Sequence, residues 1–422
     1  LSVGEPRDLA EFAAGIVGTL DDGSIICTSN YRKFRDRFER ECRLEHKTII
    51  SCWDTDRVLG RTFDLAFIDL RDWPDVIALS RVVGTVRGGG LIFVMLPYDY
   101  RTRTYYDEIV PPYFDKPPRK IMLRRLVKKS MNRRGIYVFD VTKNMFLSKP
   151  EETKKEYRKK DIRVPKNIRM PEEIYRLAAS PDQVNVLKSF ESWEHYIILL
   201  ANRGRGKSAS IGLGLTGYAT LFTKKHKRAF FACLTSRSTL NVEEVFRFAQ
   251  RAHEALGMEY EFSPREHTLK SDILRLEFEF PHRALKMAHV ADALVVDEVA
   301  AIPFTFLRRA IKAYRKIIFS GTVHGYEGTG RIFAVRFLKM LDDMGSEYKK
   351  IELREPIRYA SDDPVENWLF DVLLLDAEPA SVDLEILERI SEAKLIELDP
   401  EKYFLEGGKY EEFLKTLIGI LT

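Results

Sequence analysis

The chain has 422 residues, of which 45% are hydrophobic, and this is enough for two or three domains because one core rarely grows beyond about 250 to 300 residues. With 31% charged and 11% aromatic residues, and no apolar run near the roughly 18 residues of a spanning helix, the composition excludes a disordered chain and a membrane protein. The net charge is +5, but Lys116 to Arg169 alone holds nineteen Lys and Arg against five Asp and Glu.

Residues 1–110 alternate strand-like apolar runs with helical stretches. The predicted strands are Ser24–Cys27, Thr48–Cys52, Asp64–Asp69 and Gly90–Leu96, and the predicted helices are Arg32–Arg43 and Asp75–Val86. This order predicts an α/β fold, here an N-terminal Rossmann-like βαβ domain with a parallel sheet. Gly88–Gly90 precedes a strand instead of following one, so we interpret it as a tight turn and not as a dinucleotide fingerprint. No chemistry is predicted for this domain.

Residues 111–170 form a basic, proline-containing connector with one more predicted strand, Ile136–Val141. Two clusters, KKSMNRR at Lys128–Arg134 and KKEYRKK at Lys154–Lys160, are typical of segments that contact a phosphate backbone. The predicted RNA-binding residues here are Lys128, Lys129, Arg133 and Arg134. The alternative is a solvated linker whose charge only aids solubility.

A second domain is predicted for residues 171–350. Its elements are expected in the order helix Pro181–Trp193, strand Tyr196–Leu200, a glycine-rich loop and a helix, strand Ala229–Leu234, helix Asn241–Leu256, strand Ala293–Val296, a helix, and strand Lys316–Ser320. This pattern predicts a RecA-like P-loop NTPase core of the helicase type. Residues 351–422, which end in the amphipathic stretch Tyr410–Leu421, are expected to begin a second helicase lobe but are too few to complete one.

The segment ANRGRGKS, Ala201–Ser208, directly follows an apolar strand and opens a helix, as a P-loop does. Backbone N–H groups of such a loop bind phosphates, the lysine reaches the β and γ phosphates, and the hydroxyl ligates magnesium. Ala201 stands where glycine is usual. The predicted nucleotide-binding residues are Gly204, Arg205, Gly206, Lys207, Ser208 and Ala209.

A second carboxylate site for the metal is predicted in ALVVDE, Ala293–Glu298, about ninety residues later. Asp297 is predicted to hold Mg²⁺ through water together with Ser208, and Glu298 to orient and deprotonate the attacking water. With Lys207, these two acidic residues are the predicted catalytic groups. The alternative for the Asp-Glu pair is a cap at the end of a strand.

Two further segments are expected near the nucleotide. Gln183, in SPDQVNVL, is placed as in helicases that read the adenine edge with a glutamine amide, which predicts ATP as the nucleotide; an ordinary surface glutamine is the alternative. TSRS, Thr235–Ser238, ends the next strand, and its Ser236 and Arg237 are predicted to contact RNA phosphates. Plain strand-end capping is the alternative for this segment.

Four strings together resemble one family: RGRGKSA (Arg203–Ala209), DEVAAIP (Asp297–Pro303), SGTVHGYEGTGR (Ser320–Arg331) and EPIRYASDDPVENWLFD (Glu355–Asp371). The chain resembles the RNA-helicase-like ATPase module of the tRNA(Met) cytidine acetyltransferases and their eukaryotic rRNA and tRNA cytidine acetyltransferase relatives. The resemblance is close from Pro171 to about Asp376, and residues 1–150 are similar in layout to the N-terminal domain of the family. The chain departs from the pattern at Gly321, where threonine is frequent, and at Ile332, where glycine is usual.

The resemblance implies ATP and Mg²⁺ as cofactors, RNA and most of all tRNA as partner, and a cytoplasmic enzyme that couples ATP hydrolysis to acetylation of a cytidine. The four cysteines have no CxxC spacing, which favours reduced thiols and agrees with that location. No coenzyme A pyrophosphate loop is found, so acetyl-CoA is expected only in an acetyltransferase domain of the same full-length protein or of a separate chain. The alternatives are a nucleotide-gated RNA-binding module with little turnover, and a DNA or RNA translocase unrelated to acetylation.

Arg358 in EPIRY stands where helicases of this kind carry an arginine that reaches the γ-phosphate. It is therefore predicted as a catalytic residue that stabilises charge in the transition state. The alternative is a structural ion pair with Asp362, Asp363 or Glu366.

Overall fold

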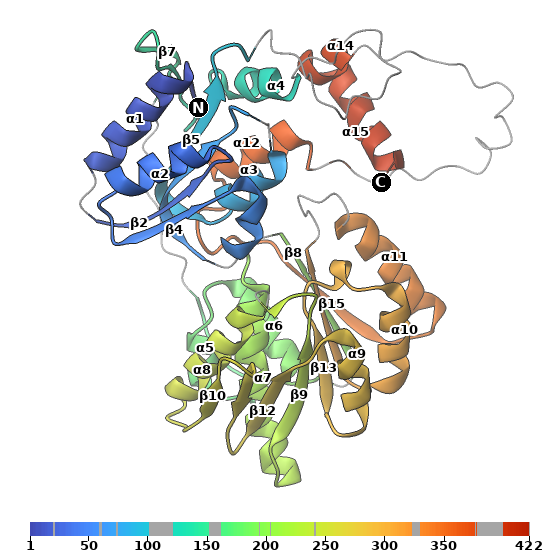
Figure 1. Cartoon of the computed structure of the whole chain (residues 1–422). Coiled ribbons are helices and arrows are strands. Elements are labelled where there is room, and N and C mark those ends of the chain that lie inside the picture. Colours follow the sequence, from blue (N-terminus) through green and yellow to red (C-terminus); the bar gives the residue numbers. More distant parts are fainter. Residues whose placement is uncertain are drawn as a thin grey trace, which may run out of the picture. The chain divides into compact units, whose positions relative to one another are not determined.

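The structure of the protein is a computed structural model that describes residues 1–19, 22–58, 61–72, 75–100, 121–151, 162–193, 195–202, 204–239, 242–322, 330–375, 377 and 400–421. Its contacts divide the chain into two compact units (Figure 1). The first unit joins Leu1–Glu156 with Asp362–Thr422, and the second unit is Tyr157–Ser361. The second unit is therefore inserted into the first along the chain.

The first unit is built on a seven-stranded sheet of order β3-β2-β4-β5-β1-β6-β7. All of its strands run parallel except β7, which pairs antiparallel with β6. The strands are β1 (Ser2–Gly4), β2 (Ser24–Thr28), β3 (His46–Ile50), β4 (Phe63–Asp69), β5 (Val86–Pro97), β6 (Val138–Asp140) and β7 (Met145–Ser148). The four strands predicted for residues 1–110 correspond to β2 to β5, whereas the three residues of β1 are too few to show a periodic pattern.

Gly88–Gly90 lies inside β5 and not in a turn before it. The register between β4 and β5 shifts between Phe63 and Leu65, which marks a bulge opposite these glycines. Gly89 has φ +81°, and a Cβ on Gly90 would lie 2.5 Å from the carbonyl oxygen of Asp64. The predicted tight turn is thus wrong, because the glycines serve a bulge in a long strand.

Helices α1 (Pro6–Gly18) and α2 (Arg32–Glu41) cover one face of this sheet. Their buried side chains, among them Leu9, Phe34 and Phe38, form one core with inward residues of β2, β4 and β5. Helix α3 (Val76–Val83) contacts β4 and β5. Helix α12 (Pro364–Leu373), from the C-terminal segment, packs against both α3 and α4 (Ile121–Ser130). The unit ends with α14 (Pro400–Leu405), which contacts α4, and α15 (Lys409–Leu421).

These contacts change two predicted regions. The strand expected within the connector is β6, which pairs with β1 in the first sheet, so that residues 121–151 are part of a folded unit instead of a linker. Residues 362–422 are also grouped with this unit, and the expectation that residues 351–422 begin a second helicase lobe stays a prediction. Sequence patterns missed both because the pairings join segments more than 130 residues apart.

The second unit has an eight-stranded sheet of order β10-β11-β12-β9-β13-β14-β8-β15. The six strands from β12 to β15 in this order are parallel, and β10 and β11 extend the sheet as antiparallel strands. The strands are β8 (Tyr196–Ala201), β9 (Phe230–Thr235), β10 (Glu261–Ser263), β11 (Thr268–Lys270), β12 (Leu274–Phe278), β13 (Ala293–Val296), β14 (Ile317–Thr322) and β15 (Tyr348–Leu353).

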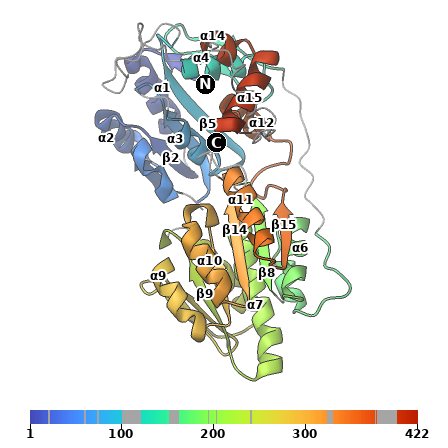
Figure 2. The ribbon, with the colours of Figure 1, turned by 90° about the vertical axis from the view of Figure 1, so that its right-hand side faces the viewer.

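Helices cover both faces of the second sheet, as Figure 2 shows for α10 and α6. Alternate residues of the strands point to opposite sides, so that Ile197 and Leu199 of β8 join one core while Ile198 and Leu200 join the other. The first core is closed by α5 (Glu172–Arg176), α6 (Pro181–Phe190), α7 (Lys207–His226) and α8 (Glu243–Ala255). The second is closed by α9 (Pro281–Ala284), α10 (Phe304–Ala313) and α11 (Gly330–Asp343).

All four cysteines are free and buried, as expected for reduced thiols. Within the described residues, no helix combines the length and the apolar character needed to cross a membrane.

Candidate nucleotide-binding site

The glycine-rich loop lies between the end of β8 at Ala201 and the start of α7 at Lys207. Gly204 and Gly206 have φ values of +74° and +76°, a region that side chains rarely adopt. Gly206 also has no room for a side chain, since a Cβ would lie 2.4 Å from Nε2 of Gln183 and 2.4 Å from Cδ1 of Ile357. Both glycines are therefore required by the loop conformation; Arg203 lies outside the described residues.

The sheet brings the predicted catalytic residues to this loop. Strand β14 pairs with β8 on one side and with β13 on the other, so the carboxyl ends of all three meet at one edge. Asp297 and Glu298 directly follow β13, and Lys207 and Ser208 begin α7. The Ser208 hydroxyl donates to Oδ2 of Asp297 at 3.0 Å.

Thr322, the last residue of β14, connects the other two predicted groups. The Lys207 ammonium donates to its Oγ1 at 3.1 Å, and the Thr322 hydroxyl donates to Oε1 of Glu298 at 3.0 Å. Thr322 was not among the predicted site residues, although it lies in the segment that carries the family resemblance. Thr322 could have been predicted from its position, because it is a hydroxyl residue at the end of β14, the strand that pairs with β8.

Asp297 has a perturbed side chain and Glu298 an unusual backbone conformation. Asp297 is buried, and its pKa is raised first by that burial and then by the charge of Glu298. Glu298 has φ +53°, a left-handed conformation that costs a non-glycine residue about 1–2 kcal/mol. Its backbone is fixed by bonds to Oδ1 of Asp297 and from the amide of Ala301. Strained backbone of this kind gathers at functional sites.

The Ser208 hydroxyl and the Asp297 carboxylate offer adjacent oxygen ligands, which is the chemistry that Mg²⁺ prefers. Asp297 is buried beside the carboxylate of Glu298, and both features raise its pKa, so a cation bound here would offset two adjacent negative charges. The residues present therefore fit a magnesium ion at this place.

A segment after β15 packs onto the loop. The Ile357 amide donates to the Gly204 carbonyl at 3.0 Å, and the buried Arg205 side chain donates to the Arg354 carbonyl and to the Tyr359 hydroxyl, both at 3.1 Å. Arg205 therefore fastens residues 354–359 to the loop through its side chain. Its role in nucleotide binding, through the backbone, stays a prediction.

Gln183 is buried at the start of α6 and contacts the same loop. Its Nε2 donates to the Gly206 carbonyl at 3.0 Å, and its Oε1 accepts from the Ala179 amide at 2.6 Å. In this structure the amide ties α6 to the P-loop, and recognition of adenine by Gln183 stays a prediction. Ala209 is buried in the first turn of α7.

Arg358 belongs to the segment that covers the loop. Burial lowers the pKa of its guanidinium, the charge of Glu244 in α8 raises it, and the charge of Arg247 in α8 lowers it. Ser236 and Arg237 follow β9, whose end lies beside Asp297 because the Asp297 amide donates to the Thr235 carbonyl at 2.9 Å. Ser236 is buried and Arg237 is exposed.

Two family models match the chain. Residues 198–376 match the model described as RNA cytidine acetyltransferase NAT10/TcmA, helicase domain, and residues 11–141 match that described as tRNA(Met) cytidine acetyltransferase TmcA, N-terminal. The chain belongs to the TmcA/NAT10 family. Relatives named tRNA(Met) cytidine acetyltransferase TmcA include those of Thermofilum pendens, 36% identical over 391 residues, and Thermococcus kodakarensis, 35% identical over 408 residues.

These matches cover 88% and 92% of this chain and 48% and 49% of the relatives, so the chain spans about half the length of the curated relatives that it matches. Among solved structures, the large terminase from a thermophilic bacteriophage is 14% identical with a TM-score of 0.31, over 55% of this chain and 52% of that chain. This likeness is too weak to bear on function. Residues 323–329, which include the first six residues of the family string HGYEGTGR (residues 324–331), lie outside the described residues.

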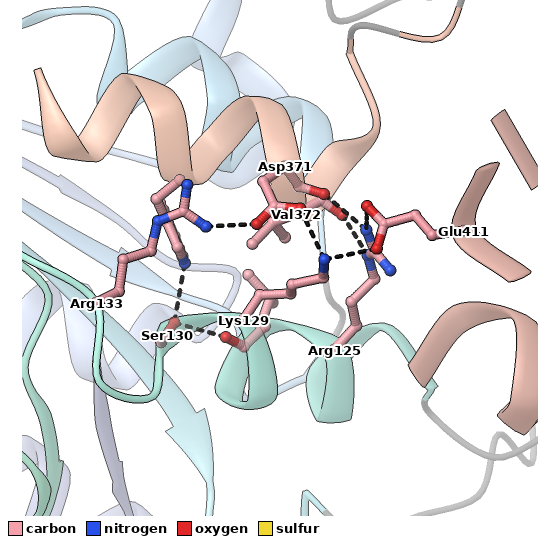
Figure 3. A network of polar contacts seen from close by, with 9 residues as sticks. Arg125, Lys129, Ser130, Arg133, Asp371, Val372 and Glu411 are labelled. Atoms are coloured by element: carbon pink, nitrogen blue, oxygen red, sulfur yellow. Dashed lines mark hydrogen bonds and ion pairs between the residues drawn. The ribbon is translucent and has the colours of Figure 1, made fainter. Parts of the chain in front are cut away.

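In this member of the TmcA/NAT10 family, two of the cations predicted to bind RNA, Lys129 in α4 and Arg133 just after it, contact the C-terminal segment (Figure 3). Lys129 binds Asp371 at 2.8 Å and Glu411 at 2.6 Å, and Arg133 binds Asp371 at 2.5 Å. The buried Arg125 donates to the carbonyls of Asp371 and Val372 and to Glu411. Sequence reasoning missed this network because its acidic members lie some 240 to 280 residues further along the chain.

The other two cations are placed similarly. Lys128 donates to the carbonyl of Leu405, and Arg134 donates to the carbonyl of Asp362 at 2.8 Å. The basic run Lys128–Arg134 thus stabilises the first unit, which corrects its interpretation as a solvated linker and leaves its contact with RNA a prediction. The second basic cluster, Lys154–Lys160, lies outside the described residues.

Proposed function

We propose that this chain is an ATP-hydrolysing, RNA-helicase-like module of an RNA cytidine acetyltransferase, which couples ATP hydrolysis to the handling of RNA for formation of N4-acetylcytidine. Its curated relatives are named tRNA(Met) cytidine acetyltransferases, which supports tRNA as the RNA partner. The position of β14 between the P-loop strand and the strand that precedes Asp297 supports a RecA-like core. We assign no step of acetyl transfer to these 422 residues.

One observation carries the proposal: a continuous chain of hydrogen bonds from Lys207 through Thr322 to Glu298, beside the Ser208–Asp297 pair. Lys207 and the backbone N–H groups of the loop bind the β and γ phosphates of ATP. Glu298 then orients a water for in-line attack and accepts its proton. Mg²⁺ bound by Ser208 and, through water, by Asp297 would supply charge compensation for the phosphates.

Thr322 is proposed to link these events. Its hydroxyl accepts from Lys207 and donates to Glu298, so a γ-phosphate that attracts Lys207 also alters the surroundings of the Glu298 carboxylate. Nucleotide binding would in this way affect the group that positions the water. The hydroxyl of Thr322 alone connects the ammonium of Lys207 to the carboxylate of Glu298.

The test compares Glu298→Gln and Lys207→Ala with wild-type protein in ATP turnover and ATP binding. Glu298→Gln keeps the shape of the side chain but removes the base, and we expect kcat to fall by about 10²- to 10⁴-fold with ATP affinity nearly unchanged. Lys207→Ala should lower both, because the lysine contacts phosphate in the ground state as well. Glu259→Gln, an exposed residue of the same unit, is the matched control.

Wild-type turnover no faster than that of Glu298→Gln would contradict the proposal and favour a nucleotide-gated RNA-binding module. Turnover stimulated equally by DNA and by RNA would instead favour a translocase unrelated to acetylation.

A further inference from the structure

The first unit has a crevice at the carboxyl edge of its sheet. Strands β1 to β5 are parallel, so the loops after them gather at one edge, where ligands of open α/β sheets bind. The crevice measures about 580 Å³ and is formed by the loops after β1, β2, β4 and β5 and by the first two turns of α1 and α2. The lining residues that matter here are Tyr31, Lys33, Phe34, Arg37, Arg71 and Tyr98.

A buried ion pair makes the floor of the crevice rigid. The guanidinium of Arg71 donates twice to Asp69, at 2.8 and 2.7 Å, and Asp69 also accepts from the Ser29 hydroxyl at 2.7 Å. The guanidinium of Arg71 lies 5.3 Å from the ring centre of Tyr31 and 4.9 Å from that of Phe34. Arg71 therefore holds the aromatic wall in place while its own charge is compensated.

Exposed aromatic residues gather along the same edge. Among the described residues six large aromatic side chains are strongly exposed, and three of them follow carboxyl ends of this sheet: Tyr31 after β2 (41% exposed), Trp53 after β3 (71%) and Tyr98 after β5 (40%). The loops of Tyr31 and Trp53 are joined, because Asn30 accepts from the Ser51 hydroxyl and the Cys52 amide. Water-exposed rings that gather along one surface are typical of proteins on which bases stack.

The charge of the edge favours an anion. Helix α2 has five basic residues against three acidic ones, and its Lys33 and Arg37 line the crevice, where Arg37 also pairs with Glu41 at 2.8 Å. Glu5 and Asp99 also line it, so the positive charge is concentrated on the side of α2. Rings and cations side by side match a nucleotide, whose base stacks while its phosphate pairs with a cation.

We propose that the carboxyl edge of the first sheet binds an unpaired RNA segment, with one nucleotide in the crevice between Tyr31 and Tyr98 and a neighbouring base on Trp53. This inference rests on RNA as the partner in the proposed function, and it assigns a role to residues 1–110, for which the sequence predicted no chemistry. Three rings on separate loops fit several successive bases better than one free nucleotide.

The experiment measures binding of a single-stranded RNA of about seven nucleotides to the full chain without ATP, by fluorescence anisotropy. Trp53→Ala, Tyr31→Ala and Tyr98→Ala should each weaken binding by roughly 5- to 100-fold, the range found for loss of one stacked base. Trp53→Phe should restore most of the affinity but abolish quenching of tryptophan emission by RNA. Phe146→Ala removes a ring that is about as exposed as Tyr31 but lies on β7, the last strand of the sheet opposite β3. This variant should leave the affinity unchanged.

A 5′-mononucleotide that binds as tightly as the oligomer would overturn the extended site, and so would equal affinity for a fully paired RNA duplex. Unchanged affinity in all three alanine variants, with RNA still bound, would place RNA elsewhere and leave the proposed function intact. Absence of any RNA binding by the wild-type chain would contradict the RNA partner itself. ATP turnover measured without RNA separates the two proposals, because these variants should keep it at the wild-type rate.

Discussion

The two units of the chain carry different kinds of side chain at the same place in their sheets, the edge formed by the carboxyl ends of the parallel strands. Both are built on a mainly parallel sheet, and in both the polar residues that matter follow the carboxyl ends of adjacent strands. In the second unit these residues are linked by short hydrogen bonds from Ser208 to Asp297 and from Lys207 through Thr322 to Glu298. In the first unit the corresponding edge has exposed rings around an open crevice.

The loop after the first strand of each site accounts for much of this difference. After β8 two glycines with positive φ give the backbone a turn of the kind found in phosphate-binding loops. After β1 the chain continues through Glu5 and Pro6 into α1, and proline has no N–H to offer. Sheet topology thus places the site, while the residues after each strand decide whether it can bind phosphate through the backbone.

The largest expected effect is the loss of ATP turnover in Arg358→Ala, which should affect the sheet edge of the second unit and not that of the first. If Arg358 stabilises the transition state of hydrolysis, its removal should lower kcat by roughly 10³-fold with little change in ATP affinity. Arg354→Ala, an exposed arginine of the same segment, is the control and should keep near-normal turnover. A lower melting temperature with parallel losses of binding and rate would instead assign Arg358 a structural role.

A smaller effect is expected for Asp371→Asn in the first unit. Burial by itself would raise the pKa of Asp371, but hydrogen bonds from Lys129 and Arg133 outweigh it and lower the pKa below its usual value. A lowered folded-state pKa stabilises the fold above the unfolded pKa of about 3.9, and this stabilisation is lost as the pH falls through the folded value. At pH 7 the substitution should therefore lower the unfolding free energy of this unit by about 1–3 kcal/mol.

Denaturant titrations at pH 7 and pH 3, with hydrogen exchange of α4 amides as a local probe, check this expectation. The difference between wild type and Asp371→Asn should shrink at pH 3. Asp362→Asn, whose more exposed carboxylate lies 3.4 Å from Arg134, is the matched control with an expected loss below about 1 kcal/mol. A difference that does not depend on pH would show that the charge of Asp371 is not what stabilises the unit.

The smallest effect concerns which edge contacts the RNA backbone. Arg237→Gln in the second unit and Lys33→Gln in the first each remove one exposed cation. Each lost phosphate contact should reduce the slope of log K against log salt by about 0.7 for a single strand. Titrations of RNA affinity against salt for both variants show whether one edge or both bind the backbone, and an unchanged slope in either variant removes that cation from the interface.

The arrangement of the candidate nucleotide site could largely be predicted from the sequence because its central part is local. An apolar strand, two glycines, Lys207 and Ser208 are consecutive, and Asp297 directly follows a buried strand, so their shared edge follows from parallel topology. The strand predicted as Ala293–Val296 has the same bounds in the structure. Thr322 and the segment 354–359 needed the tertiary structure, because only the order of β14, β8 and β15 brings them to the loop.

The organisation of the chain was decided by tertiary structure alone. The sequence by itself determined the strands, the helices and the glycine-rich loop motif, since each of these depends on residues that are close together in the sequence. It could not determine that α12 and α15 return to α4, where Asp371 and Glu411 neutralise cations that looked free to bind RNA. Nor could it show the crevice between Tyr31 and Tyr98. The ion-pair network and the crevice both depend on contacts between segments that are distant in the sequence. These contacts stabilise the protein only once the whole sheet and its covering helices have formed.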